Sequence, residues 1–182
     1  MLSQASRQLA DDHVALDNVL KQLQESMDSE DIKAIYARLD LFWARLAVHI
    51  RAEHLHLFPA VMNGLSDMTA DHSVAPTLNQ GRLAIKRLRA DHDFFMHELA
   101  RAIGILRDLV KATDREAMRT VRDAVLDIEK RLIIHNELEE SQIYRWAKTI
   151  LNEQEQANLA TRINGELGNR PSRFSLDAWS NH

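Results

Sequence analysis

The sequence predicts an all-α protein, an up-down-up-down four-helix bundle with a short additional C-terminal helix and a tail. Its composition favours helix, because 45% of the 182 residues are hydrophobic and 27% are charged, while only 5 Gly and 3 Pro interrupt the chain. Apolar residues also recur at steps of three and four through four long segments, as they do on one face of a helix. A chain of this length can bury a core within one domain. We therefore expect one helical domain over residues 1–168 and a tail over residues 169–182.

The first two helices are expected over about residues 2–27 and 32–63. Their apolar stripes consist of Leu9, Leu16, Leu20, Leu23 and Met27, and then of Ile32, Ile35, Leu39, Phe42 and Leu46. A histidine lies inside the first stripe, and a histidine and a glutamate continue the second. The second helix should end at Gly64, since glycine is common just after the last turn of a helix.

Two more long helices are expected over residues 77–111 and 115–150, after a connection at about residues 65–76. Their stripes consist of Ile85, Leu88, Phe95, Leu99, Ile103, Leu106 and Val110, and then of Val121, Val125, Ile128, Leu132, Ile143, Trp146 and Ile150. The break at residues 112–114 contains threonine and aspartate, which cap helix N-termini. A short fifth helix is expected over residues 153–167.

The composition also argues against several classes of function. A net charge of −4 disfavours a nucleic-acid partner, since nucleic-acid-binding domains usually carry a concentrated basic surface. The absence of cysteine excludes disulfides, thiolate metal sites and cysteine nucleophiles. No apolar run approaches the roughly 18 residues that span a membrane, and the N-terminus has no apolar signal region. We therefore expect a soluble, cytoplasmic protein.

Histidine and glutamate interrupt the apolar stripes of all four long helices. These residues are His13, His49, Glu53, His92, His135 and Glu139. Each glutamate follows a histidine by four residues, which places the two side chains on the same face of a helix. For each pair of successive histidines in this set, the residue halfway between them in the sequence lies in the connection that joins their two helices. An up-and-down bundle therefore brings all four histidines to one depth.

These six residues are predicted to be metal ligands. A carboxylate buried among leucines costs several kcal/mol unless a cation compensates it, and no Lys or Arg lies on the stripes. Two bridging glutamates with two histidines for each metal suit a dinuclear site. Nitrogen and oxygen ligands without sulfur suit iron, and less distinctively zinc or manganese.

Simpler interpretations exist for each residue taken alone. A single histidine on a stripe is more often a hydrogen-bonded core residue, and a single pair at this spacing is more often a surface pair. The recurrence on four helices favours the metal. Two alternatives stay open, namely His56 as a further or alternate ligand and Glu140 in place of Glu139. No role in the site is expected for the remaining histidines, which are His54, His72, His97 and His182.

The pattern resembles the signature of the hemerythrin-like family, the HHE cation-binding domain, over about residues 5–150. The resemblance implies a non-haem di-iron site at the six predicted ligands, with two irons bridged by carboxylates and oxo or hydroxo groups. It also implies a small diatomic ligand, oxygen or nitric oxide. The oxygen-carrying members have a second histidine on the third helix, where this chain has Met96, and place the last carboxylate five residues after its histidine. The chain is in this respect more similar to members that sense or handle iron, oxygen or nitric oxide.

We therefore expect a binding or sensing protein rather than an enzyme, acting as a monomer or a homodimer. Two alternatives remain. One is a di-iron enzyme of oxidative chemistry or of iron-centre repair. The other is a structural or interaction bundle that uses the metal as a clip.

Overall fold

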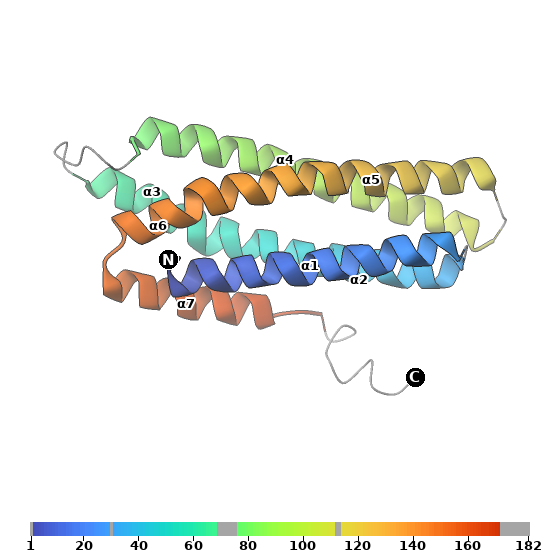
Figure 1. The fold of residues 1–182 in the computed structure, drawn as a ribbon, viewed down its shortest axis with the longest axis horizontal. Helices are drawn as coiled ribbons and strands as arrows, with labels where there is room; N and C mark the ends of the chain where they lie inside the picture. Colours follow the sequence, from blue (N-terminus) through green and yellow to red (C-terminus); the bar gives the residue numbers. More distant parts are fainter. Residues whose placement is uncertain (1, 30, 69–75, 112–113, 172–182) are drawn as a thin grey trace.

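The structure is a computed structural model, and it describes residues 2–29, 31–68, 76–111 and 114–171. The described residues form helices joined by short connections, and none of them lies in a strand. The predicted all-α bundle is thus confirmed (Figure 1). In chain order the helical elements are α1 (Gln4–Asp28), α2 (Ile32–Ala52), η1 (Glu53–Leu57), α3 (Phe58–Asp67), α4 (Leu78–Leu109), α5 (Arg115–Leu138), η2 (Glu139–Ile143), α6 (Tyr144–Ile150) and α7 (Glu153–Gly168).

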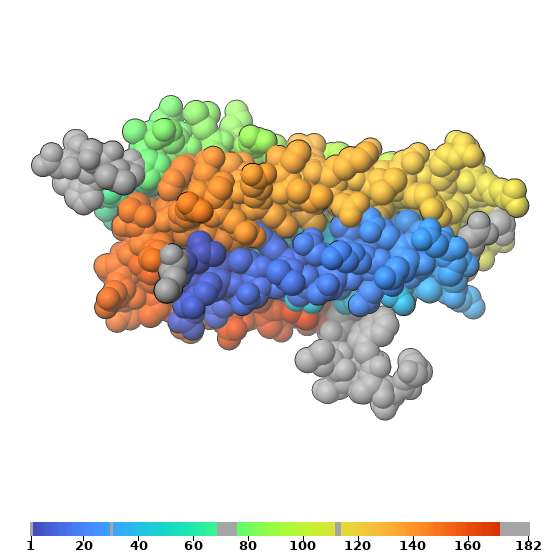
Figure 2. All heavy atoms as spheres, in the orientation of Figure 1, coloured from blue at the N-terminus to red at the C-terminus, as the bar shows by residue number. Residues whose placement is uncertain are grey.

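Four rods make up the bundle. The first is α1, the second runs from α2 through the π-helical turn η1 into α3, the third is α4, and the fourth runs from α5 through η2 into α6. Successive rods run in opposite directions, and α7 packs on the outside across α1 and α2 (Figure 1). In the space-filling view, side chains of α1 meet those of the α5–α6 rod along one face (Figure 2).

Capping side chains fix where the rods begin. Ser3, Asp31, Thr77, Asp114 and Asn152 each precede a helix and accept hydrogen bonds from its first N–H groups. These residue types are the common N-caps, because their side-chain oxygens satisfy donors that have no partner within the helix.

The apolar core is divided into two clusters. One contains residues such as Leu16 and Phe95 and joins α1, α2, α4 and α5. The other contains residues such as Leu9 and Leu88 and joins α3, α6 and α7 to the ends of α1 and α4. His13 comes between Leu9 and Leu16 along α1, and in the same way a histidine of α4 comes between Leu88 and Phe95. A polar layer thus crosses the bundle between two apolar clusters.

Two details differ from the sequence-based expectation. The second rod does not end at Gly64 but continues to Asp67. At Gly64 a Cβ atom would be only 3.1 Å from the side chain of Ile150. The glycine allows a close approach between α3 and α6 rather than a helix end. At the end of α4, Val110 is 54% exposed and Leu109 is buried in its place. The expected tail lies mostly outside the described residues.

Candidate metal centre

The structure brings the six predicted ligands together inside the bundle. Two groups of four ligand atoms form, each with its atoms within 4.8 Å of one another. The first group consists of His13, His49, Glu53 and Glu139, and the second consists of Glu53, His92, His135 and Glu139. All six side chains are buried. The glutamates belong to both groups, whereas each histidine belongs to one.

Each glutamate directs one oxygen towards each group. Glu53 Oε1 lies 3.5 Å from His49 Nε2, and Glu53 Oε2 lies 3.3 Å from His92 Nε2. For the other glutamate, Oε2 of Glu139 lies 3.3 Å from His13 Nε2, and its Oε1 lies 3.2 Å from His135 Nε2. This is the arrangement that two carboxylates need to bridge two cations.

Two of these carboxylate oxygens have no hydrogen-bond partner among the described residues, which bears on whether the residues fit a metal. Glu53 Oε2 and Glu139 Oε1 are buried and accept no hydrogen bond from any described residue. A buried acceptor without a partner costs about 1–3 kcal/mol, and more when it is charged. Both oxygens belong to the group that contains His92 and His135. A cation bound there would satisfy both, so the donor set fits a metal.

A π-helical turn begins at each of the two glutamates. The N–H of Phe58 donates to the carbonyl of Glu53, and the N–H of Tyr144 donates to the carbonyl of Glu139, each five residues back. Such turns often occur at functional sites. Each adds a residue to one helical turn and so rotates the side chains that follow it about the rod axis. The sequence periodicity did not reveal either turn.

Asp12 orients His49 from the first helix. Its carboxylate accepts a hydrogen bond from His49 Nδ1 at 3.1 Å and from Arg45 Nη2 at 2.5 Å. Burial opposes ionisation of Asp12, but the hydrogen bond and charge of His49 and those of Arg45 outweigh it, and the pKa of Asp12 falls to about 2. With Nδ1 donating to a carboxylate, the Nε2 atom of His49 faces the other ligands and is free to bind a metal.

The second half of the bundle repeats this arrangement. Asp91 on α4 accepts from His135 Nδ1 at 3.3 Å and from Arg131 Nε at 2.7 Å. Arginine, histidine and glutamate thus recur at four-residue steps in both rods, as Arg45 with His49 and as Arg131 with His135. Sequence reasoning missed both aspartates, although each stands immediately before a predicted ligand.

The remaining two histidines are also held through their Nδ1 atoms. His13 Nδ1 donates to Glu140 Oε1 at 2.9 Å, and His92 Nδ1 lies 2.8 Å from His54 Nε2. The expectation that His54 has no role in the site is therefore wrong. His54 lies within the π turn η1, next to Glu53. Glu140 supports His13 instead of taking the place of Glu139 in either group.

Other candidate residues lie away from the six. His56 Nε2 is 4.0 Å from a carboxylate oxygen of Glu166, on the side of α7. His97 is exposed. His72 and His182 lie outside the described residues. Met96 is half-buried and packs against one apolar cluster.

Tyr144, which sequence reasoning also missed, places its hydroxyl in the first group. The oxygen lies 3.2 Å from His13 Nε2, 3.3 Å from Glu53 Oε1 and 3.4 Å from Glu139 Oε2. The side chain is fully buried. Its ring stacks on that of His13, with ring centroids 5.8 Å apart.

Without a cation, protonated histidine balances the negative charge of the buried glutamates in this layer. Burial lowers the pKa of His49, but the charge of Glu53 and the hydrogen bond to Asp12 outweigh it and raise the pKa to about 10. Burial likewise opposes ionisation of Glu53, yet the charge of His49 holds its pKa well below the usual range. Metal binding would release such protons, because ligands bind a metal in their deprotonated form.

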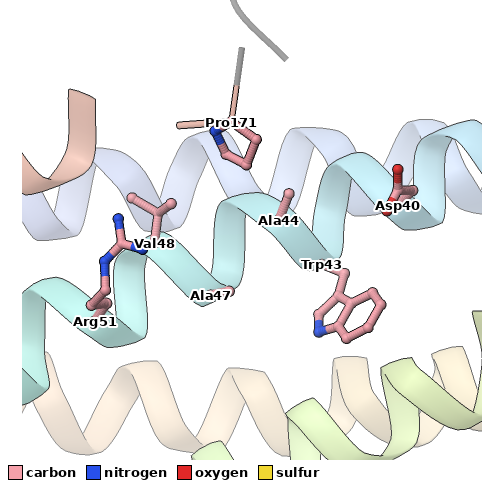
Figure 3. A pocket seen from close by; sticks show the side chains of 7 residues that line it. All are labelled: Asp40, Trp43, Ala44, Ala47, Val48, Arg51 and Pro171. Carbon is pink, nitrogen blue, oxygen red and sulfur yellow. The ribbon is translucent and has the colours of Figure 1, made fainter. Parts of the chain in front are cut away.

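Two surface hollows lie beside the rods and contain none of the six residues. One, of ≈ 230 Å³, lies on the outer face of α2, where Pro171 lies over Ala44 and Val48 (Figure 3). The other, of ≈ 480 Å³, is lined by Met62, Arg82, Ile85, Lys86, Arg89, Ala90 and Asp93. Arg89 and Asp93 are close enough to His54 to affect its pKa. One of its lining residues, Asp93, follows the predicted ligand His92 in the chain.

Comparison with known proteins agrees with this geometry. The family model described as the hemerythrin HHE cation binding domain matches residues 4–147. The searches of curated proteins and of solved structures returned no match. None of the described helices combines the length and the apolar character that a membrane span requires.

Proposed function

Because the chain belongs to the hemerythrin HHE cation-binding domain family, we propose that its polar layer holds two iron ions and binds a small diatomic ligand, oxygen or nitric oxide. One observation carries this proposal. Each of the two buried glutamates has one oxygen in each histidine group. A single ion could use only half of these atoms, and the carboxylate oxygens and histidines of the other group would stay buried without a cation.

The donor chemistry supports iron. Four imidazole nitrogens and two carboxylates, with no sulfur, suit iron and also suit manganese or zinc. The pair of irons would supply the open coordination positions and the redox chemistry that recognition of oxygen or nitric oxide requires. The protein residues would supply rigidity, because every ligand histidine is held at Nδ1 by a partner from another helix.

The surroundings support binding of a small ligand more than turnover of a large substrate. The six ligand side chains are 0–3% exposed, and neither surface hollow includes one of them. An organic substrate would have to displace core side chains to reach the layer. A diatomic molecule is much smaller and would have to displace far less.

The test is metal loading of matched variants. The wild-type protein and the variants His13→Ala, His92→Ala and His97→Ala are reconstituted with ferrous ion without air, and bound iron is measured per chain. We expect two irons in the wild type and in His97→Ala, whose histidine is exposed. His13→Ala and His92→Ala should each bind one, because each removes a donor from a different group.

Chelation and air complete the test. Removing iron should lower the melting temperature, because Glu53 and Glu139 then stay buried without a cation. Mixing the ferrous protein with oxygen or nitric oxide should change its visible spectrum. One iron in every variant, or a melting temperature that chelation leaves unchanged, would contradict the dinuclear site.

A further inference from the structure

The two halves of the bundle are related by an approximate repeat that includes more than the six candidate ligands. Position by position, the equivalent pairs are Arg45 and Arg131, His49 and His135, Glu53 and Glu139, His54 and Glu140, and Phe58 and Tyr144. The aspartates that support the histidines, Asp12 and Asp91, are likewise equivalent. Both π turns start at the same place in this repeat. Equivalent residues therefore occupy equivalent positions around the two histidine groups.

The pair Phe58 and Tyr144 breaks the chemical equivalence. The Phe58 ring stacks on His92 with centroids 6.0 Å apart, and the Tyr144 ring stacks on His13 with centroids 5.8 Å apart. The rings thus occupy matching positions in the two groups. Phenylalanine brings no donor atom to its group, whereas tyrosine brings a hydroxyl oxygen to the other.

The Tyr144 oxygen lies among ligand atoms rather than against one acceptor. It lies 3.2 Å from His13 Nε2. Its distances to the two carboxylate oxygens, 3.3 and 3.4 Å, are longer than the usual separation of about 2.7–2.8 Å for an O–H···O bond. One hydroxyl can donate only one hydrogen bond. Neighbouring donors that each bind one ion at about 2.1 Å lie about 3 Å apart when they are at right angles. The observed spacing is close to that of atoms that share one metal ion.

We propose that the Tyr144 oxygen is a ligand of the iron bound by His13 and His49, an inference that rests on the proposed iron site. On binding ferric ion, the phenol would give up its proton to water, as other ligands do on metal binding. That iron then has five protein donors, namely His13, His49, Glu53, Glu139 and Tyr144. The other iron has four, with Phe58 beside it. The small ligand therefore binds at the His92 and His135 position, which is the one with more open coordination sites.

The chain allows a clean test, because it contains only two tyrosines. The second, Tyr36, accepts a hydrogen bond from Arg107 and packs against the apolar cluster that contains Leu23 and Leu106. Wild type, Tyr36→Phe and Tyr144→Phe are loaded with iron and oxidised, and the bound iron is measured. Visible absorption and resonance Raman spectra then report whether a phenolate is bound to ferric ion, which gives an intense charge-transfer band and phenolate ring modes.

We expect the band and the ring modes in wild type and Tyr36→Phe, and their loss in Tyr144→Phe. The double variant Tyr144→Phe, Phe58→Tyr should regain them, because it moves the phenol to the equivalent position beside His92. Absence of the band in Tyr36→Phe with two ferric ions bound would overturn the inference even if Tyr144→Phe failed to fold. Iron content is measured separately, so a chain that binds fewer than two irons would count against the proposed function and not against Tyr144.

Discussion

Replacing Asp12 with asparagine should weaken both the fold and the metal centre. The carboxylate is 6% exposed and is shared between His49 and Arg45. Its pKa of about 2, against an ordinary value of 3.8, corresponds to about 2 kcal/mol of stability at neutral pH. For a domain of this size, such a loss of stability lowers the melting temperature by about 4–8 °C. Loss of a partner that orients a ligand histidine typically costs about 10–100-fold in metal affinity.

The pH dependence of this effect has a definite sign. A carboxylate whose pKa is lower in the folded than in the unfolded protein stabilises the fold above the unfolded value. The stability difference between wild type and Asp12→Asn should therefore be complete above pH 3.8 and should shrink as the pH falls towards about 2. Chemical unfolding of the metal-free proteins at several pH values measures it.

Two matched variants control the experiment. Asp11→Asn changes the exposed neighbour and should leave melting temperature and iron affinity unchanged. Asp91→Asn removes the equivalent carboxylate beside His135, and should cost less stability because its partner Arg131 is 41% exposed and Arg45 is 18% exposed. Competition with a chelator gives the iron affinities. If folded Asp12→Asn held iron as tightly as Asp11→Asn, the carboxylate would not orient His49.

Two further predictions concern packing and the residue one turn after His92. Gly81→Ala should lower the free energy of unfolding by about 1 kcal/mol, because the new Cβ would lie 2.5 Å from a buried leucine of α3. Gly104→Ala, with nothing within 4 Å of the new Cβ, should raise the free energy of unfolding by about 0.5–1 kcal/mol. Urea unfolding measures both variants, and equal effects would contradict the packing argument. Met96→His should add a nitrogen donor near the iron proposed at His92 and slow the decay of the oxygen-induced visible band in stopped-flow mixing. Equal decay at equal iron content would show that Met96 does not face the proposed site.

The helices and the six polar stripe residues could be predicted because both depend on periodicity. Burial selects apolar residues at steps of three and four, so a histidine at such a step is conspicuous in the sequence. Leu16, Leu88 and Phe95 are buried as their spacing predicts. The shared depth of His13 and His92 follows from a different observation, namely that the connections between helices lie midway between successive histidines.

The residues that support these six could not be predicted in the same way. Asp12 precedes His13 in the chain but orients His49 on the next helix, and spacing within one helix carries no information about contacts between helices. Tyr144 is five residues after Glu139, a step that in a regular α-helix points the two side chains in widely different directions. The π turn brings it back to the same side. Regular periodicity therefore predicts Trp146 on the stripe and not Tyr144.

The cost of the polar layer argues that binding, and not stability, accounts for it. Apolar side chains of similar volume in place of a buried charged network often leave a protein equally stable or more stable. Here the layer separates two apolar clusters that could otherwise join, and it leaves oxygens of Glu53 and Glu139 without partners. The capped helix ends and both apolar clusters define the bundle without the layer. The proposed pair of cations would give each of the four carboxylate oxygens a positive partner, and the unequal residues Phe58 and Tyr144 would then make the two cations chemically different.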